Sequence, residues 1–447
     1  MPISSQTKDA LNQLALSMIQ ETEEPSLADI SLTGGFRQGA FPERLRDAAG
    51  EETLILTGDD LRLYSQACAA LSQEKEMEHL SIKDVDDELW DFACKLFVHR
   101  EKYEDDRARA RAVRELVSRL HKPWQDYEIM AVVDNLKLTV HELDVIGVKI
   151  RYLSRQSVLA WGFGSSRWPE EYANEFIRRA VAIAEETAGS PQRAAERAIC
   201  KIDDALHALR TALVGSMKAS ILDEQILFKR GRLLAVKQAN TNEIKFVQGR
   251  RLFGPLGFDI RRNTAELARK YLASINPIIA GSFPPAIQNQ LRRALHWIGT
   301  SITRESYDDK VVDLCTALEA LLTVKADPRK GEAIALRIML LPSALGEGFF
   351  SPIEAYELYE LRSRVIHGSD LRACGRRDYW HLLSLAVVMV GLFVDLVSQD
   401  KSITTPAKLI SAIEAPDLLS QAISWLERIK SRSSRDIANF ARARLPQ

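Results

Sequence analysis

Cysteine is scarce in this 447-residue chain, and its spacing excludes two common structural devices. The five cysteines lie far apart, their number is odd, and no two of them form a C-x-x-C pair. A disulfide framework or a zinc ribbon is therefore not expected, and the pattern favours a reducing cytoplasm. Cys374 and His381 form a conceivable metal pair, but no further ligand lies at suitable spacing, so we expect no metal site.

The chain also lacks an excess of charge of either sign and a long hydrophobic run. Lys and Arg together number 60 and Asp and Glu 61, which gives a net charge of −1. A protein that coats nucleic acid through bulk positive charge is not expected, so any contact with phosphate must come from a local patch. The most apolar run, Leu382–Val394, would span about 20 Å as a helix, short of the roughly 30 Å of a bilayer. It predicts a buried core helix and no membrane partner. The first residues do not resemble a secretory signal.

Several motifs that identify enzyme classes are missing as well. The sequence contains no G-x-x-x-x-G-K-[ST] loop, no G-x-G-x-x-G, no G-x-S-x-G elbow and no H-E-x-x-H. Gly162-Phe163-Gly164 is an isolated fragment that we interpret as a turn. The sequence therefore predicts no bound cofactor.

The length and the pattern of the chain suggest about three domains, at roughly 150 residues per domain. Residues 1–125 are predicted to be helical, residues 126–283 to form an α+β middle domain, and residues 284–447 to form a helical domain. Pro284-Pro285 marks the start of the last domain. The fold class is therefore expected to be mainly α with a smaller α+β middle region and a C-terminal antiparallel helical bundle.

Hydrophobic periodicity locates the elements of the last two domains. Rough alternation of β-branched residues predicts two or three strands in residues 127–155, and helical spacing returns at Glu170–Glu186 and Gln192–Met217. Lys229-Arg230-Gly231 is predicted to be a hairpin turn. After Pro284 every element is predicted to be helical, over residues 285–303, 308–325, 330–342, 351–367, 378–398 and 415–441.

The segment Leu358–Asp370 carries the strongest candidate for chemistry, an Arg362-x-x-x-x-His367 pair followed by Gly368. An amphipathic helix leads into the pair, and Gly368 is placed as its C′ cap, so His367 is predicted on the last turn, where the helix dipole favours an imidazolium. On an ideal helix Arg362 lies about 7.5 Å along the axis and about 140° around it from His367. Either the helix distorts near its end, or a second copy of the chain completes the site.

A second pair with the same spacing, Arg376 and His381, makes the spacing alone weak evidence. This pair straddles a predicted loop-to-helix junction, and Asp378 beside Arg376 and Arg377 offers a simple ion-pair role. We therefore favour the first pair.

Three motifs in the order of a known family support that choice. Asp313–Leu322 reads DLCTALEALL, Ala335–Leu341 reads ALRIMLL, and Leu358–Gly368 reads LYELRSRVIHG. Over residues 284–400 the chain resembles the Apea-like branch of the HEPN superfamily. The resemblance implies an all-α bundle, homodimerisation through the motif helix and, in many members, metal-independent cleavage of RNA.

The resemblance also assigns residues. Arg362 and His367 match the two named motif positions, and Ser363 fills the adjacent position, where a polar residue is common. Glu319 and Arg337 match polar positions of the upstream helices. Those two either act on substrate or form a buried ion pair, and we favour the pair.

Such a site has a simple chemistry. RNA supplies its own nucleophile, the 2′-hydroxyl; an imidazole transfers its proton near neutral pH, and a guanidinium binds the phosphate oxygens. No metal is needed. Between Leu361 and Arg377 only Asp370 opposes a basic stretch that we expect to bind the RNA backbone. Its arginines are Arg362, Arg364, Arg372, Arg376 and Arg377.

The sequence therefore predicts a cytoplasmic, homodimeric HEPN-type endoribonuclease regulated by its N-terminal region, in the manner of a toxin or antiviral defence effector. The alternative is a non-catalytic HEPN-like module that binds RNA or protein and dimerises. Both readings remain open at this point, because some members of the superfamily have lost catalysis.

Overall fold

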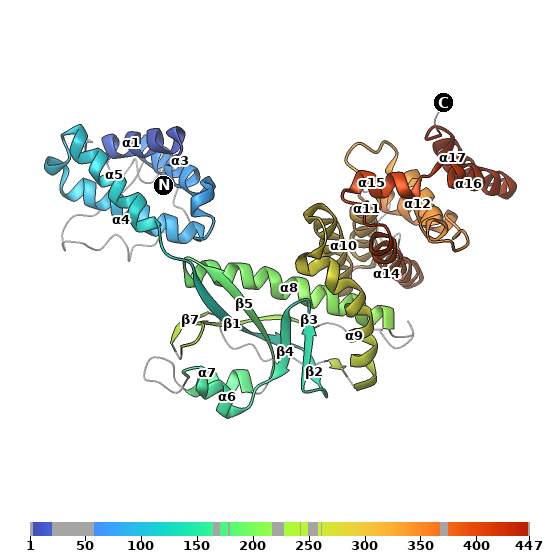
Figure 1. Cartoon of the computed structure of the whole chain (residues 1–447), viewed down its shortest axis with the longest axis horizontal. Helices are drawn as coiled ribbons and strands as arrows, with labels where there is room; N and C mark the ends of the chain where they lie inside the picture. Colours follow the sequence, from blue (N-terminus) through green and yellow to red (C-terminus); the bar gives the residue numbers. More distant parts are fainter. Residues whose placement is uncertain are drawn as a thin grey trace. The chain divides into compact units, whose positions relative to one another are not determined.

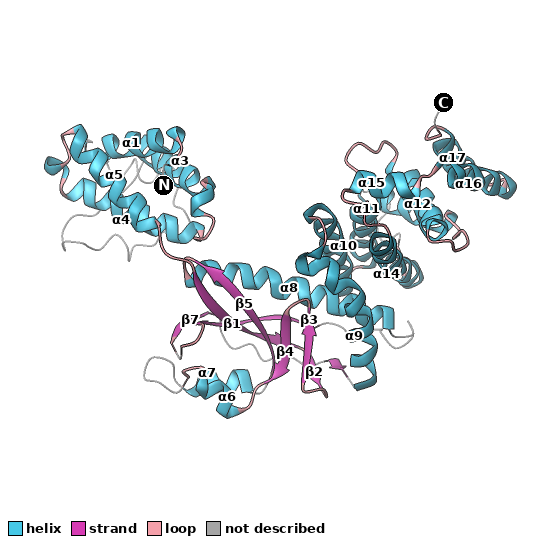
Figure 2. Cartoon of the chain, in the orientation of Figure 1, coloured by secondary structure: helices cyan, strands magenta, loops and turns pink. Residues whose placement is uncertain are grey.

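The computed structural model describes residues 3–19, 58–163, 170–177, 179–216, 228–241, 243–248, 258–260, 262–366 and 374–445. In this part of the chain all strands lie between residues 125 and 260, and helices dominate elsewhere (Figure 2). The predicted class, mainly α with a smaller α+β region, is confirmed. By its internal contacts the chain divides into two compact units. One unit comprises Met1–Ile129, Glu185–Ala198 and Val236–Phe246; the other comprises Met130–Ala184, Ile199–Ala235 and Val247–Gln447.

The first unit contains the N-terminal helices, which bury one continuous core that includes Leu14, Leu71 and Phe92. Ser81 begins one of these helices with a capping box, accepting from the backbone N–H of Asp84 while the Asp84 carboxylate accepts from Ser81 N. The described part of residues 1–125 is helical, as predicted. The elements are α1 (Ser5–Ile19), α3 (Gly58–Gln73), η2 (Lys75–Met77), α4 (Ile82–Val98), η3 (Arg100–Lys102) and α5 (Asp106–Leu120).

The middle of the chain forms a six-stranded sheet in the order β3-β4-β5-β1-β6-β7, and β2 pairs with β8 in a separate parallel pair. Strand β4 is antiparallel to both β3 and β5, with Ile150 opposite Leu143 and Ala182. The strands are β1 (Gln125–Asp134), β2 (Leu136–Leu138), β3 (Glu142–Val145), β4 (Val148–Tyr152), β5 (Ala180–Ala188), β6 (Lys229–Gln238), β7 (Ile244–Gln248) and β8 (Phe258–Ile260). The accompanying helices are α6 (Arg155–Ala160), α7 (Glu170–Ile177) and α8 (Pro191–Ser216).

Three local predictions in this region are wrong. Four strands, not two or three, begin in residues 125–152. The helix expected over 170–186 ends at Ile177, and β5 follows, because pairing with β4 overrides the helix propensity of its alanines. Lys229-Arg230-Gly231 is the start of β6 and not a turn. A Cβ at Gly231 would lie 3.0 Å from Asp134 Oδ2 and 3.1 Å from Val132 O, so this glycine permits close approach of two strands.

The C-terminal helices, coloured from yellow to dark red in Figure 1, belong to the second unit by their internal contacts. Helix α11 packs against α10, α12, α13 and α14, and α12 is buried over almost its whole length. The helices are α9 (Arg262–Pro277), α10 (Pro285–Thr303), α11 (Tyr307–Leu322), α12 (Lys330–Ala344), α13 (Ile353–Ile366), α14 (Arg376–Gln399), α15 (Pro406–Ile413), α16 (Pro416–Ile429) and α17 (Arg432–Arg442), and a π-helical turn (Ile278–Ser282) precedes α10.

The predicted helices 285–303, 308–325, 330–342, 351–367 and 378–398 match α10 to α14 within a few residues at each end. The prediction of a single helix over residues 415–441 is wrong, because two helices, α16 and α17, cover this range. Lys430 adopts a left-handed conformation that ends α16, and the Ser431 side chain accepts from Ser434 N to begin α17. Helix α15 was not predicted.

Helix α14 is the one described helix that is long and apolar enough to cross a membrane. In this fold, however, 61% of its most apolar window is buried inside the protein. Leu383, Met389 and Phe393 are fully buried against the neighbouring helices. The run Leu382–Val394 is thus part of a core helix, as predicted.

A buried arginine joins α8 to α10. Arg210 donates to the Phe228 carbonyl at 3.1 and 2.5 Å, to the Gly299 carbonyl at 3.4 Å and to Nδ1 of His207 at 3.0 Å. Burial, followed by the positive charge of Arg210, lowers the pKa of His207 to about 3. His207 is therefore neutral, and its Nδ1 accepts the hydrogen bond that the guanidinium donates.

We predict opposite effects of the same substitution at two helical glycines. A Cβ at Gly299 would overlap His207 Nδ1 and lie 2.7 Å from the His207 Cα, whereas a Cβ at Gly391 meets nothing within 4 Å. Gly299→Ala should lower the free energy of unfolding by about 1–3 kcal/mol through overpacking. Gly391→Ala should raise it by about 0.5–1 kcal/mol, because alanine favours the helix. Urea unfolding measures both, and equal effects of the two substitutions would contradict the close packing of α8 on α10.

Candidate active site

Helix α13 presents the motif arginine in a defined setting. The Nη2 of Arg362 lies 3.2 Å from Oε1 of Glu319 on α11, and the guanidinium stacks on the ring of Tyr359 with its Cζ 5.4 Å from the ring centroid. The side chain of Arg362 is 23% exposed. Its Nε is buried and has no hydrogen-bond partner among the described residues. Glu319 therefore holds one edge of the guanidinium and Tyr359 holds one face, and the guanidinium retains further N–H groups that can donate hydrogen bonds.

The carboxylate of Glu319 is the centre of this cluster. Its Oε1 accepts from the Tyr359 hydroxyl at 2.7 Å, and its Oε2 accepts from Lys330 Nζ at 3.0 Å. The side chain of Glu319 is only 13% exposed, whereas that of Lys330 is 45% exposed. Two cations therefore share one half-buried anion, which leaves a net positive charge beside the solvent.

The pKa shifts of two side chains near Glu319 agree with this arrangement. Burial, followed by the hydrogen bond to Glu319, raises the pKa of Tyr359 well above its ordinary value, so the hydroxyl remains a donor. Burial likewise raises the pKa of the Cys315 thiol on the same face of α11. Cys315 is therefore a packed thiol and not a nucleophile.

The partner residue of the motif, His367, follows Ile366 directly in the sequence and lies outside the described residues, as do Gly368 and Arg372. The predicted C′ cap also falls there. Ser363 is half-buried, and Arg364, Arg376 and Arg377 are exposed.

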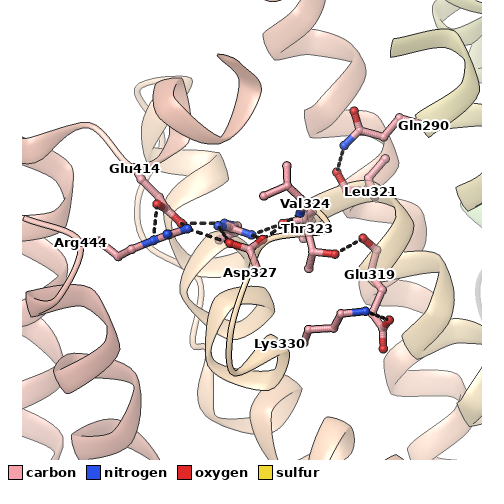
Figure 3. A network of polar contacts seen from close by, with 11 residues as sticks. Gln290, Glu319, Leu321, Thr323, Val324, Asp327, Lys330, Glu414 and Arg444 are labelled. Atoms are coloured by element: carbon pink, nitrogen blue, oxygen red, sulfur yellow. Dashed lines mark hydrogen bonds and ion pairs between the residues drawn. The ribbon is translucent and has the colours of Figure 1, made fainter. Parts of the chain in front are cut away.

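The prediction that Glu319 and Arg337 form a buried ion pair with each other is wrong. Each of them forms ion pairs with other residues. Arg337 is fully buried and binds Asp327 through two nitrogens at 2.5 and 2.9 Å, while its Nε lies 2.7 Å from Glu414 Oε1. Arg444 completes the network, lying 2.8 Å from Asp327 and 3.0 Å from Glu414 (Figure 3). Glu319 instead pairs with Arg362 on α13. Arg337 is not available to it, because its side chain on α12 binds Asp327 in the loop after α11 and Glu414 just after α15.

This network also holds the end of α11. Arg337 Nη1 donates to the Leu322 carbonyl at 2.7 Å. The Gln290 amide donates to the Leu321 carbonyl at 2.7 Å, as Figure 3 shows. Both carbonyls belong to the last turn, where no intrahelical donor is available, and a guanidinium there complements the helix dipole. Because Glu319 begins this last turn of α11, the network fixes the turn from which its carboxylate projects.

The second Arg–His pair has ordinary partners. His381 Nε2 lies 3.0 Å from Glu354 on α13, and both side chains are about half exposed. Asp378 accepts from Gly375 N at 2.8 Å and so caps α14 at the junction predicted from the sequence. Cys374 donates its backbone N–H to Asp308, and burial raises the pKa of its thiol to about 12. In the described parts of the chain no group of three or more His, Cys, Asp or Glu is arranged to hold a metal ion.

Sequence reasoning missed Tyr359 and Lys330. Tyr359 precedes Arg362 by three residues on one helix, and that spacing places the two side chains on one face. Nothing in the sequence around Lys330 indicates its partner. Comparison with known proteins adds no identification, since no family model, no curated protein and no solved structure matches this chain.

Removing Arg337 should destabilise the C-terminal helices strongly. Arg337→Met leaves Asp327 buried with only Arg444 as a counter-ion, so we expect a loss of about 3–5 kcal/mol in the free energy of unfolding. The double variant with Asp327→Leu removes both charges and should recover at least half of that loss. Urea unfolding tests this, and a double variant no more stable than the single one would contradict it.

The same network predicts an acid dependence. Burial raises the pKa of Asp327, but hydrogen bonds from Arg337 and from Val324 N, together with the charge of Arg444, outweigh burial and lower it overall. Its pairing therefore stabilises the fold fully above the unfolded pKa of about 4 and is lost as the pH falls through the lower native pKa. The stability difference between the unaltered chain and Asp327→Asn should shrink below pH 4. A difference that stays constant down to pH 2 would contradict this assignment.

Proposed function

We propose that residues 284–447 form a HEPN-like domain of the Apea-like branch and that this domain is a metal-independent endoribonuclease. The observation that carries the proposal is the setting of Arg362, held by Glu319 and Tyr359 with donors to spare, five residues before His367. The order of the three motifs and the packing of α11, α12 and α13 against one another support the family assignment.

The chemistry requires two groups. Arg362 binds the scissile phosphate and stabilises the charge that develops on its oxygens. His367 accepts the proton of the 2′-hydroxyl, whose oxygen forms a bond to phosphorus while the bond between phosphorus and the 5′-oxygen breaks. The imidazolium of His367 then returns the proton to the leaving 5′-oxygen. The products are a 2′,3′-cyclic phosphate and a 5′-hydroxyl. Lys330 and the exposed Arg364, Arg376 and Arg377, with Arg372 beside them in the sequence, hold the rest of the RNA backbone.

We propose further that the enzyme works as a homodimer through α13. On an ideal helix Arg362 and His367 point about 140° apart, so a two-fold contact brings together the arginine of one copy and the histidine of the other. The half-exposed Ile366 at the end of α13 provides an apolar contact for such an interface. A role as a cytoplasmic toxin or antiviral defence effector, restrained by the N-terminal region, completes the proposal.

The second candidate is a non-catalytic module that binds RNA or protein and dimerises. Arg362 already has a counter-ion in Glu319, and this pairing favours a structural role for the arginine. Such a module binds RNA without turnover, and it therefore differs from the nuclease in one measurable property.

Cleavage of labelled RNA in the presence of EDTA tests the nuclease. The unaltered chain should produce cyclic phosphate ends, identified by mass spectrometry. His367→Ala and Arg362→Ala should each lower the rate at least about 100-fold, because each removes a group acting in the transition state.

Two matched controls lie nearby. His381→Ala removes the other spaced histidine and should retain the rate within about threefold. Arg364→Ala removes a contact to the RNA backbone and no transition-state group, so it should weaken RNA binding but retain the rate at saturating RNA within about threefold. Loss of activity only in His381→Ala would move the site to the second pair. Binding of RNA without any cleavage would support the module and contradict the nuclease.

A further inference from the structure

A groove between α1 and α5, in the N-terminal helices, has the dimensions of a ligand site. It encloses about 530 Å³, within the range typical of small-molecule pockets. Ile3 and Val113 are buried at its base and Val117 is half-buried, so its inner surface is apolar. The remaining lining residues are Lys8, Asn12, Ala110, Arg114, Ser118 and His121. Among the described residues that line the groove, three side chains are basic and none is acidic.

Only some basic side chains of the N-terminal helices have a counter-ion among the described residues, and those of the groove, like Arg107 and Arg111 of α5, have none. On and just after α5, Arg109 pairs with Asp106, while Arg119 and Lys122 share Glu88. No ion pair or side-chain hydrogen bond joins Lys8, Arg114 or His121 to any other residue in the part of the chain that the structure describes. The positive charge of the groove is therefore uncompensated.

The spacing of the charges limits the ligand. Arg114 lies on α5, and His121 is the residue that follows the last residue of that helix, Leu120, so the two side chains are separated along the groove by the last two turns of α5. A carboxylate would neutralise either Lys8 or Arg114 and leave the other. An anion of higher charge and greater length, such as two linked phosphates, neutralises both, and guanidinium and ammonium groups both bind phosphate well. The His121 imidazole can add a hydrogen bond.

We propose that this groove binds a soluble organic diphosphate. Its phosphates lie along Lys8, Arg114 and His121, and its apolar body covers Ile3, Val113 and Val117. Asn12 and Ser118 supply hydrogen bonds to the polar end. The site is independent of the proposed ribonuclease, since all its residues belong to the N-terminal helices.

Isothermal titration of the full chain with geranyl diphosphate tests the proposal. Saturable binding is expected, with about tenfold weaker binding for each of Lys8→Gln and Arg114→Gln, because each removes one charge-assisted contact. Geraniol, which lacks the phosphates, should not bind measurably. Inorganic pyrophosphate, which lacks the apolar body, should bind at least about tenfold more weakly than the ester.

Arg107→Gln and Arg111→Gln are matched controls, since both residues are exposed on α5 and neither lines the groove. They should leave the affinity unchanged. Weakening by Arg111→Gln equal to that by Arg114→Gln would overturn the proposal in favour of diffuse attraction. If geraniol bound as tightly as geranyl diphosphate, the phosphates would not be needed, and if pyrophosphate did so, the apolar body would not be needed. Either result would overturn the proposal. Displacement of the diphosphate by a single-stranded oligonucleotide at equal concentration would instead identify a nucleic-acid surface.

Discussion

The ion pair between Glu319 and Arg362 is the contact on which the account of this protein depends. It joins α11 to α13, places the motif guanidinium against Tyr359, and leaves one buried nitrogen of that guanidinium without a partner in the described chain. A carboxylate that is 13% exposed and shared by two cations is costly to desolvate unless all of its oxygens are bonded. Tyr359 and Lys330 meet that requirement, so the cluster is built around the anion.

Glu319 can hold Arg362 in position only if the last turn of α11 stays in place. That turn ends at carbonyls that have no intrahelical donor, and buried side chains from α10 and α12 supply the donors. Arg337 does so while it is held by two carboxylates, one in the loop after α11 and one just beyond α15. Helices that are distant in the sequence are thereby connected to the turn that carries Glu319.

Whether a feature of the fold or of the candidate site could be predicted from the sequence depends on how far apart in the sequence the interacting residues lie. Helices α10 to α14 were predictable because their apolar spacing, prolines and caps are local signals. The position of Arg362 was predictable from a motif. The partners of Arg337 were not, because Asp327, Glu414 and Arg444 are brought together only by the packed bundle. The start of β6 was misread for the same reason, since the role of Gly231 is set by its approach to β1 and a single sequence does not contain that contact.

A double-mutant cycle on the proposed RNA cleavage tests the central claim most directly. Glu319→Gln and Arg362→Gln would be measured singly and together under single-turnover conditions. If Glu319 acts by positioning Arg362, the double variant should be no slower than Arg362→Gln alone, with a coupling energy of about 1 kcal/mol or more. Losses that simply add would show that the two residues act independently, and would contradict the account.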